Sequence, residues 1–506
     1  MGATRVVHSG DDLQSVLNAA QAGDVIQLDA GASFTGNFVL PVKAGTDLTR
    51  QIVVRSSAYA SLPAGKRVGP DDAGKMAKIV ARGLQPAITF SDGASYYRLV
   101  GLEIATTWSE TSKTYWQLVC MGRRDDCSAD AQTEASLPHH VIFDRVYVHG
   151  TPTGNVRRGI LANAAWVGLV DSYISDIHEV GADTQAFGAW NGTGPYLIRN
   201  SYLEAGAENI MFGGADASIP NLVSSDVTVT HNTFYKPDSW NQNHPSYGKI
   251  QWTIKNLFEL KNAQRVLLSG NVFDNCWGYQ GDQPGYAIQL TPRNQSGANP
   301  WSVVQDVTIK NNVFRNVGGG INLLATDYGF PSQFQSRVQI WNNLIYNVRG
   351  QFMPGTGAAF QALSGPNDVS VRHNTTDTPV AILYMDGTNK TGLRLEWVDN
   401  LHNHGSYGFF GTNYGVGNRA IAQYLPNEPT ITNNVMAAGD PSWYSNYPGN
   451  FFPANLAAVG FQDYDKRDFR LLPSSSFHNA ATDGKDIGVD FAEFDTAQAG
   501  TALPPR

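Results

Sequence analysis

The feature that most constrains the fold is a short motif that recurs ten times along the chain. Each copy alternates apolar residues with other residues, reaches an Asn or Asp, and continues with further apolar or β-branched residues. The copies are VIFDRVYV (from Val141), VGLVDSYI (Val167), YLIRNSYL (Tyr196), VTVTHNTF (Val227), VLLSGNVF (Val266), VTIKNNVF (Val307), VQIWNNLI (Val338), VSVRHNTT (Val369), LEWVDNLH (Leu395) and PTITNNVM (Pro429). A period of two predicts a strand, and the Asx residue predicts a turn into the next short strand.

Such a unit exposes an apolar row that it cannot bury alone, so the copies must stack on one another. Stacked copies pair strand to parallel strand at about 4.8 Å. The sequence therefore predicts an all-β fold, a single-stranded right-handed parallel β-helix solenoid over residues 11–470. An Asp-capped stretch at 11–24 has helical spacing and predicts an N-terminal capping helix. Residues 1–10 are expected to precede the solenoid and residues 471–506 to close it.

One Asx residue occupies the same place in every copy, and this regularity could indicate a catalytic or metal-binding column. A structural role explains it better, because Asn tolerates the left-handed turn conformation and stacked amides can hydrogen-bond along the axis. We therefore assign the column to the scaffold. Its members are Asp144, Asp171, Asn200, Asn232, Asn271, Asn312, Asn343, Asn374, Asn400 and Asn434.

Charge and hydropathy exclude several classes of partner. The 506 residues include 36 Lys and Arg against 44 Asp and Glu, and no basic run appears, which argues against nucleic acid. No segment reaches the roughly 18 apolar residues of a membrane span. The first residues lack the pattern of a signal peptide. We expect a monomer that is secreted or periplasmic, its signal peptide absent from this sequence, although a cytosolic protein would look the same.

Three cysteines are too few for a disulfide framework. Cys120 and Cys127 bracket the polar loop CMGRRDDC, which is short enough for one bridge to close, and both the bridged and the free state remain open. Cys276 has no cationic neighbours in the sequence that would activate a thiol, so we expect a small buried residue.

Beyond the repeats, the chain contains GDVIQL, FGGADASIPNLVSSDVTVTHN, WTIKNLFELKN and TDGKDIG. With these stretches it resembles the right-handed β-helix proteins of the pectate-lyase-like superfold, especially secreted bacterial ones. The resemblance implies a carbohydrate-active protein, since most members are polysaccharide lyases or glycoside hydrolases and others are epimerases, esterases, tailspikes or adhesins. The NTD, GHG and RIK motifs of polygalacturonase-like hydrolases and the WIDH-like and RxPxxR motifs of pectate lyases are absent, so no subfamily is identified.

β-Elimination on a uronic acid needs a base for the proton next to the carboxylate and a cation or donors for the developing charge. In lyases similar to the alginate lyase and chondroitinase B group, Lys is the base, Arg the acid, and Ca²⁺ neutralises the carboxylate. In WTIKNLFELKN, alternation points Lys255, Glu259 and Lys261 outward. With Arg293 of the next coil, these are the predicted catalytic residues. The alternative is that Glu259 and Lys261 form only an exposed ion pair.

Two further sets complete the predicted site. Substrate-binding candidates are the outward amides on the next two coils and the tryptophans near the long loops, which could instead be packing lids: Gln289, Asn322, Trp252, Trp277 and Trp301. The stretches EVGADTQAFG and EAGAENIMFG align Asp183 over Glu208, about 4.8 Å apart. Such a carboxylate pair could bind Ca²⁺ together with Asp216, serve as acid and base, or belong to a structural network.

The sequence thus favours a polysaccharide lyase that cleaves an acidic, uronate-containing polysaccharide in a groove on the outer face of the β-helix. One alternative is a glycoside hydrolase that uses paired carboxylates. Another is a carbohydrate-binding or adhesive solenoid without catalysis.

Overall fold

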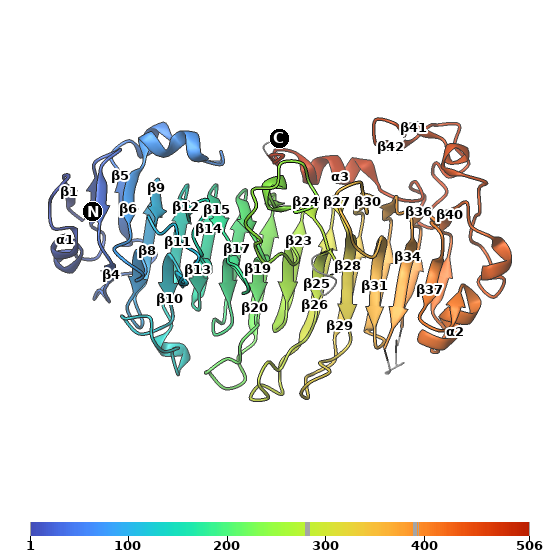
Figure 1. Ribbon diagram of the computed structural model, residues 1–506, viewed down its shortest axis with the longest axis horizontal. Coiled ribbons are helices and arrows are strands. Elements are labelled where there is room, and N and C mark those ends of the chain that lie inside the picture. Colours follow the sequence, from blue (N-terminus) through green and yellow to red (C-terminus); the bar gives the residue numbers. More distant parts are fainter. Residues whose placement is uncertain (1, 279–283, 388–391, 393, 505–506) are drawn as a thin grey trace. The chain divides into compact units, whose positions relative to one another are not determined.

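The computed structural model describes residues 2–278, 284–387, 392 and 394–504, which form two compact units. Unit 1 is drawn from Met1–Lys236 and Tyr247–Thr253, and unit 2 from Pro237–Ser246 and Ile254–Leu503. In both units the chain passes through three sheets, A, B and C, once per coil, so that strands of successive coils pair in parallel, apart from β38, which pairs antiparallel with β37 (Figure 1). This is the architecture of a parallel β-helix.

The strands of unit 1 are short. Sheet A holds β1 (Thr4–Val7), β2 (Val25–Leu28), β5 (Ile52–Ser56), β8 (Ser95–Val100), β11 (His139–Asp144), β14 (Ala165–Val170), β17 (Tyr196–Arg199) and β20 (Ser224–Thr230). Sheet B holds β3 (Ser33–Thr35), β6 (Ala77–Val80), β9 (Leu102–Ala105), β12 (Tyr147–His149), β15 (Tyr173–Ile177), β18 (Tyr202–Ala205) and β21 (Thr233–Tyr235). Sheet C holds β4 (Phe38–Leu40), β7 (Ile88–Phe90), β10 (Val119–Met121), β13 (Arg158–Ala162), β16 (Gln185–Ala189) and β19 (Glu208–Phe212).

Unit 2 repeats the pattern. Sheet A holds β23 (Ala263–Ser269), β26 (Val304–Lys310), β29 (Ser336–Trp341), β32 (Asn367–Arg372), β35 (Glu396–Val398) and β39 (Thr430–Thr432). Sheet B holds β24 (Val272–Cys276), β27 (Val313–Val317), β30 (Leu344–Val348), β33 (Thr375–Thr376), β36 (Leu401–Asn403) and β40 (Val435–Ala437). Sheet C holds β22 (Phe258–Leu260), β25 (Tyr286–Leu290), β28 (Gly319–Leu324), β31 (Ala358–Leu363), β34 (Ala381–Asp386), β37 (Gly408–Gly411) and β38 (Gly415–Val416).

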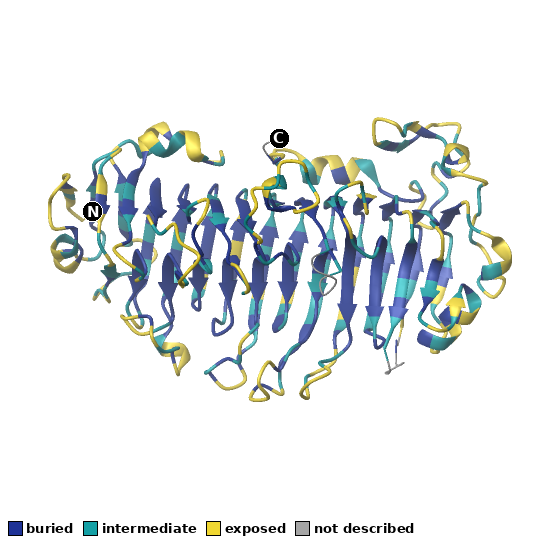
Figure 2. Cartoon of the chain, viewed as in Figure 1, coloured by how far each residue is buried: buried dark blue, intermediate teal, exposed yellow. Residues whose placement is uncertain are grey.

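The core of each unit consists of like residues stacked from coil to coil. In unit 2, Val307 of β26 pairs with Val338 of β29, and all of the surface of both residues is buried. Thr308, between the inward residues, stays partly exposed on the other side of the sheet. Each fully buried aliphatic side chain contributes about 1.5–3 kcal/mol. Figure 2 shows the result, buried strands with exposure concentrated in the loops.

The predicted Asx column divides into two neighbouring columns. In unit 2, Asn311 has a positive φ of 57°, whereas the next residue, Asn312, is buried and its Oδ1 accepts the backbone N–H of Asn271 at 2.9 Å. Such side chain to backbone bonds link Asn271, Asn312, Asn343, Asn374, Asn400, Asn434 and Asn450. The scaffold role is therefore confirmed, and the left-handed turn and the amide stack belong to adjacent residues.

The alignment of the first column members was wrong by one residue or more. Asp171 and Asn200 have φ angles of 53° and 49° and hold the left-handed position. The stacking position beside Asn200 belongs to Ser201, whose N–H donates to Asn232 Oδ1 at 2.8 Å. Asp144 lies further back, before the left-handed residue Arg145. Sequence similarity does not separate two adjacent polar columns when either can contain Asn.

The ends of the chain differ from the predicted boundaries. Residues 4–7, expected to precede the solenoid, form β1 and pair in parallel with β2. The capping helix is α1 (Leu13–Ala19), for which Asp12 accepts the N–H of Ser15 at 3.1 Å. Parallel strands end at Ala437, earlier than residue 470, and an antiparallel pair, β41 (Phe461–Asp463) with β42 (Asp468–Leu471), follows. Among the described residues, the other α-helices are α2 (Asn418–Tyr424) and α3 (Phe491–Gln498).

Candidate functional site

A ladder of polar side chains runs across sheet C of unit 2. Glu259 pairs with Gln289, Gln289 with Asn322, and Asn322 with Gln361. The residues on either side of each ladder member are apolar and buried, so alternation directs the ladder to the opposite face of the sheet. The Asn322 amide donates to Gln289 Oε1 at 3.2 Å. The structure thus brings Glu259, Gln289 and Asn322 together on adjacent coils.

Two cationic residues follow directly after these strands. The backbone N–H of Arg293 donates to the carbonyl of Lys261 at 2.9 Å, so the two residues lie side by side on neighbouring coils. The side chain of Lys261 is 12% exposed and that of Arg293 35% exposed. A ligand reaching this edge of sheet C would meet an ammonium and a guanidinium next to the amide ladder.

Glu259 holds the centre of the site. Its Oε2 accepts the Asn256 amide at 3.0 Å and its Oε1 accepts the Thr291 hydroxyl at 2.9 Å. Lys261 Nζ lies 3.7 Å from Glu259 Oε1. The carboxylate is 5% exposed, so it fixes the lysine more readily than it reaches a polymer. This arrangement is a buried ion pair held by two further donors, and it differs from the exposed pair considered as the alternative.

Asp327 is a member of the site that the sequence did not reveal. Its Oδ1 accepts Arg293 Nη1 at 2.8 Å and its Oδ2 accepts the N–H of Asn294 at 2.8 Å. Burial alone would raise the pKa of Asp327, but donors from Gly329, Asn294 and Arg293 lower it below its usual value. The carboxylate therefore stays ionised and orients the guanidinium. No motif marks Asp327, because it lies in a loop more than thirty residues from its partners.

Lys255 does not share the geometry of Lys261. The sequence predicts one strand through 252–262, but the strand covers only Phe258–Leu260, and Lys255 lies in the irregular segment before it. The Lys255 carbonyl accepts the thiol of Cys276 at 3.1 Å. As expected, Cys276 is a buried residue, and it lies outside the disulfide. The structure therefore favours Lys261 over Lys255 as the lysine of the ladder.

Two of the three predicted stacking tryptophans are buried, and that prediction was wrong for them. Trp252 is 2% exposed and its ring stacks on His178 at a centroid distance of 3.7 Å. Burial lowers the pKa of His178 to about 3, so this imidazole stays neutral. Trp277 is 1% exposed. Only Trp301 keeps part of its surface open. The sequence does not show which of the aromatic residues near loops are buried by those loops.

The predicted stacking of Asp183 over Glu208 was also wrong. Gln185, two residues further along, pairs with Glu208, and its amide donates to Glu208 Oε2 at 2.7 Å. Among the described residues, Asp216 included, no group of three or more His, Cys, Asp or Glu could hold a metal ion. Asp183 and Glu208 therefore do not stack as the carboxylate pair that suggested calcium; calcium binding stays a prediction, and we derive no step through it.

The two acidic stretches that suggested a carboxylate pair serve different contacts. Glu179 accepts two bonds from Arg157, both at 2.8 Å. Glu204 accepts the hydroxyl of Tyr202 at 2.7 Å and the N–H of Asp176 at 2.9 Å. Burial and the nearby charge of Asp176 raise the pKa of Glu204 to about 8. The contacts of Glu179 and Glu204 thus join neighbouring side chains and backbone within unit 1.

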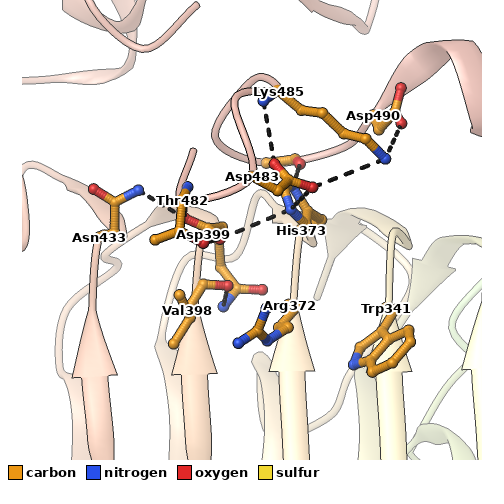
Figure 3. Close-up of polar contacts among 12 residues, drawn as sticks. Trp341, Arg372, His373, Val398, Asp399, Asn433, Thr482, Asp483, Lys485 and Asp490 are labelled. Carbon is orange, nitrogen blue, oxygen red and sulfur yellow. Dashed lines mark hydrogen bonds and ion pairs between the residues drawn. The ribbon is translucent and has the colours of Figure 1, made fainter. Parts of the chain in front are cut away.

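A second polar cluster in unit 2 attaches the C-terminal closing segment, defined here as residues 480–498 (Figure 3). His373 Nε2 lies 3.4 Å from Asp483 and 3.8 Å from Asp399. Asp399 is fully buried and accepts the N–H of Thr482 at 2.9 Å. Lys485 pairs with Asp490 at 2.8 Å. These groups join the solenoid to the closing segment, so we assign the cluster to the scaffold.

Residues 158–395 match the family model described as the right handed beta helix region. The fold is a right-handed parallel β-helix. The bridge left open by the sequence is present between Cys120 and Cys127. No helix among the residues that the structure describes is long and apolar enough to cross a membrane.

The remaining comparisons are with curated sequences and with solved structures. A search of curated protein sequences finds no match. Similar solved structures include an alginate lyase from Paenibacillus sp. (13% identity, 76% of this chain and 94% of that chain, TM-score 0.39). Two others are a mannuronic acid specific family 6 lyase from human gut microbiota (12%, 93% and 91%, 0.45) and the Dettilon tailspike protein (12%, 89% and 68%, 0.38). At such identities the likeness does not extend to activity.

Proposed function

We propose that this protein is a polysaccharide lyase that cleaves a uronate-containing polysaccharide by β-elimination at the edge of sheet C in unit 2. The observation that carries the proposal is the backbone bond between Arg293 and Lys261, which sets a potential base and a guanidinium on adjacent coils. Gln289 and Asn322 add amides beside them. This combination suits a substrate that carries a carboxylate next to an acidic C–H.

The proposed steps use residues of this chain alone. Arg293, oriented by Asp327, binds the sugar carboxylate, and the two amides donate to it as charge develops. Lys261 in its neutral form removes the proton from the carbon next to the carboxylate. The electron pair forms a double bond to the neighbouring carbon, whose bond to the glycosidic oxygen breaks. The ammonium of Lys261 then returns a proton to that oxygen, which balances the reaction. Glu259 positions Lys261.

The compartment belongs to the same proposal. A disulfide persists in oxidising surroundings, so the Cys120–Cys127 bridge supports a secreted or periplasmic protein. We further propose that the protein acts as a monomer on its polymer.

The test is a panel of uronate polymers, read at once for unsaturated product in the near ultraviolet and for new reducing ends. We expect both signals to rise together for the wild type and to fall at least about 100-fold in Lys261→Ala, since a positioned base contributes about 10²–10⁴-fold. Lys255→Ala is the matched control and should keep most of the activity.

Other outcomes separate the alternatives. Reducing ends without the unsaturated product would replace the lyase by a glycoside hydrolase. Binding without either product would indicate a carbohydrate-binding solenoid. Equal loss in Lys255→Ala and Lys261→Ala would contradict the assignment of the base.

A further inference from the structure

A hollow of about 340 Å³ lies in unit 1, and the residues of the proposed elimination site do not line it. Its wall is Trp116, which is 50% exposed although tryptophan is usually largely buried. Its polar lining includes Gln85, Gln117, Arg123, Asp126 and Ser128. A hollow of this size with an open aromatic ring and several polar groups has the features of a small-molecule site.

The indole of Trp116 is held in place from one side. Arg157 lies over the ring, with its Cζ 4.3 Å from the ring centroid. The guanidinium is fixed in turn by two bonds to Glu179, a carboxylate that is 3% exposed and also accepts the hydroxyl of Thr114. Because one face is covered and half of the residue is exposed, the opposite face remains open. A rigid open face binds a ligand at a low cost in conformational entropy.

The hollow is also lined by a loop that a disulfide and hydrogen bonds hold in place. The Cys120–Cys127 disulfide closes it, and the Gln117 amide donates to Cys127 Sγ at 2.8 Å. Arg123 donates to the carbonyl of Ser128 at 2.8 Å and pairs with Asp130 at 3.2 Å. These contacts order the lining before any ligand arrives.

We propose that this hollow is a carbohydrate-binding subsite that takes one pyranose ring of a polysaccharide chain. A pyranose presents a face of C–H groups, which packs on an indole, and an edge of hydroxyls, which both donate and accept hydrogen bonds. The hollow offers the matching surfaces: the ring of Trp116, the donor Arg123, the acceptor Asp126, and Gln117 and Ser128, which can do both. A purely apolar ligand would cover the exposed side chains of Asp126 and Ser128 without replacing their hydrogen bonds to water.

The test measures binding without turnover. The full chain carrying Lys261→Ala is titrated calorimetrically with hexasaccharides of galacturonate, of mixed mannuronate and guluronate, and of glucose. At least one hexasaccharide is expected to bind, and adding Trp116→Ala should weaken it about tenfold or more. Trp116→Tyr keeps an aromatic face and should restore part of the affinity. Trp166→Ala removes an equally exposed tryptophan, 56% exposed and outside this hollow, and should change affinity less than about twofold.

Removing the disulfide by substitution supplies a second variant of the site. Cys120→Ser with Cys127→Ser should weaken binding while the far-ultraviolet circular dichroism stays unchanged. The inference is overturned if none of the three hexasaccharides binds, or if Trp166→Ala weakens binding as much as Trp116→Ala. Binding that depends on Trp116, without cleavage of any polymer by the wild type, would uphold this inference and contradict the proposed function. If the wild type cleaves a uronate polymer and Trp116→Ala has the same KM, the proposed function is upheld and this inference is contradicted.

Discussion

Replacing Asn343 by Ala removes one member of the buried amide column in unit 2. Its Oδ1 accepts both the backbone N–H and the side-chain amide of Asn312, each at 3.0 Å. Its own amide donates to the carbonyl of Ile309 at 2.8 Å and to Asn374 Oδ1 at 3.0 Å. The side chain that makes these four hydrogen bonds belongs to a fully buried residue.

The expected loss of stability follows from these contacts. The N–H of Asn312 loses its acceptor in the interior, which costs about 1–3 kcal/mol, whereas the Asn312 amide still reaches the carbonyl of Leu268 at 3.1 Å. The two bonds donated by Asn343 add about 0.5–1.5 kcal/mol each. We therefore expect Asn343→Ala to lower the free energy of unfolding by about 2–6 kcal/mol.

The assay is urea unfolding followed by far-ultraviolet circular dichroism, with the shift in midpoint compared at equal slope. Asn243→Ala is the control. This asparagine lies exposed in the same unit, and its loss should change stability by less than about 0.5 kcal/mol. If the two variants shift the midpoint equally, the amide column does not stabilise the solenoid as argued.

Three further predictions concern titration, the closing segment and cations. Glu204 titrates with a pKa of about 8 when folded, above its usual value, so it binds its proton more tightly in the folded state. The contribution of this proton to the free energy of unfolding is complete below about pH 4.5 and is lost as pH rises towards 8. Glu204→Gln should therefore flatten the fall of Tm over that range. Parallel Tm curves for the wild type and the variant would contradict this. Asp399→Ala removes the acceptor of Thr482 and should speed proteolytic cleavage within residues 480–498, whereas the exposed Asp465→Ala should not. A chelator of divalent cations should leave the cleavage rate unchanged, because the proposed steps use residues of this chain alone; a loss of rate that added calcium restores would refute that expectation.

The fold was predictable because its signal is repeated. Each copy of the Asx motif predicts only a short strand and a turn, but ten copies require a common stacking partner. The ladder on sheet C was predictable for the same reason, since alternation decides which face Glu259, Gln289 and Asn322 occupy.

The strand register and the burial of residues by loops were not predictable. The stretches around Asp183 and Glu208 look alike, yet the structure shifts their pairing by two residues, so that Gln185 meets Glu208. A shift of two keeps the same face, and the apolar pattern therefore does not distinguish the two registers. The burial of Trp252 and Trp277 depends on loops whose path has no periodic signal. Asp327 was missed because its contact with Arg293 joins two loops.

The central claim is that Lys261 and Arg293 together perform β-elimination. The most direct measurement follows the near-ultraviolet absorbance of unsaturated product from uronate polymers with the wild type, Lys261→Ala and Arg293→Ala at equal concentration. We predict a steady rise for the wild type and a rate lower by at least about 100-fold for each variant. No absorbing product from the wild type, or an undiminished rate in both variants, would contradict it.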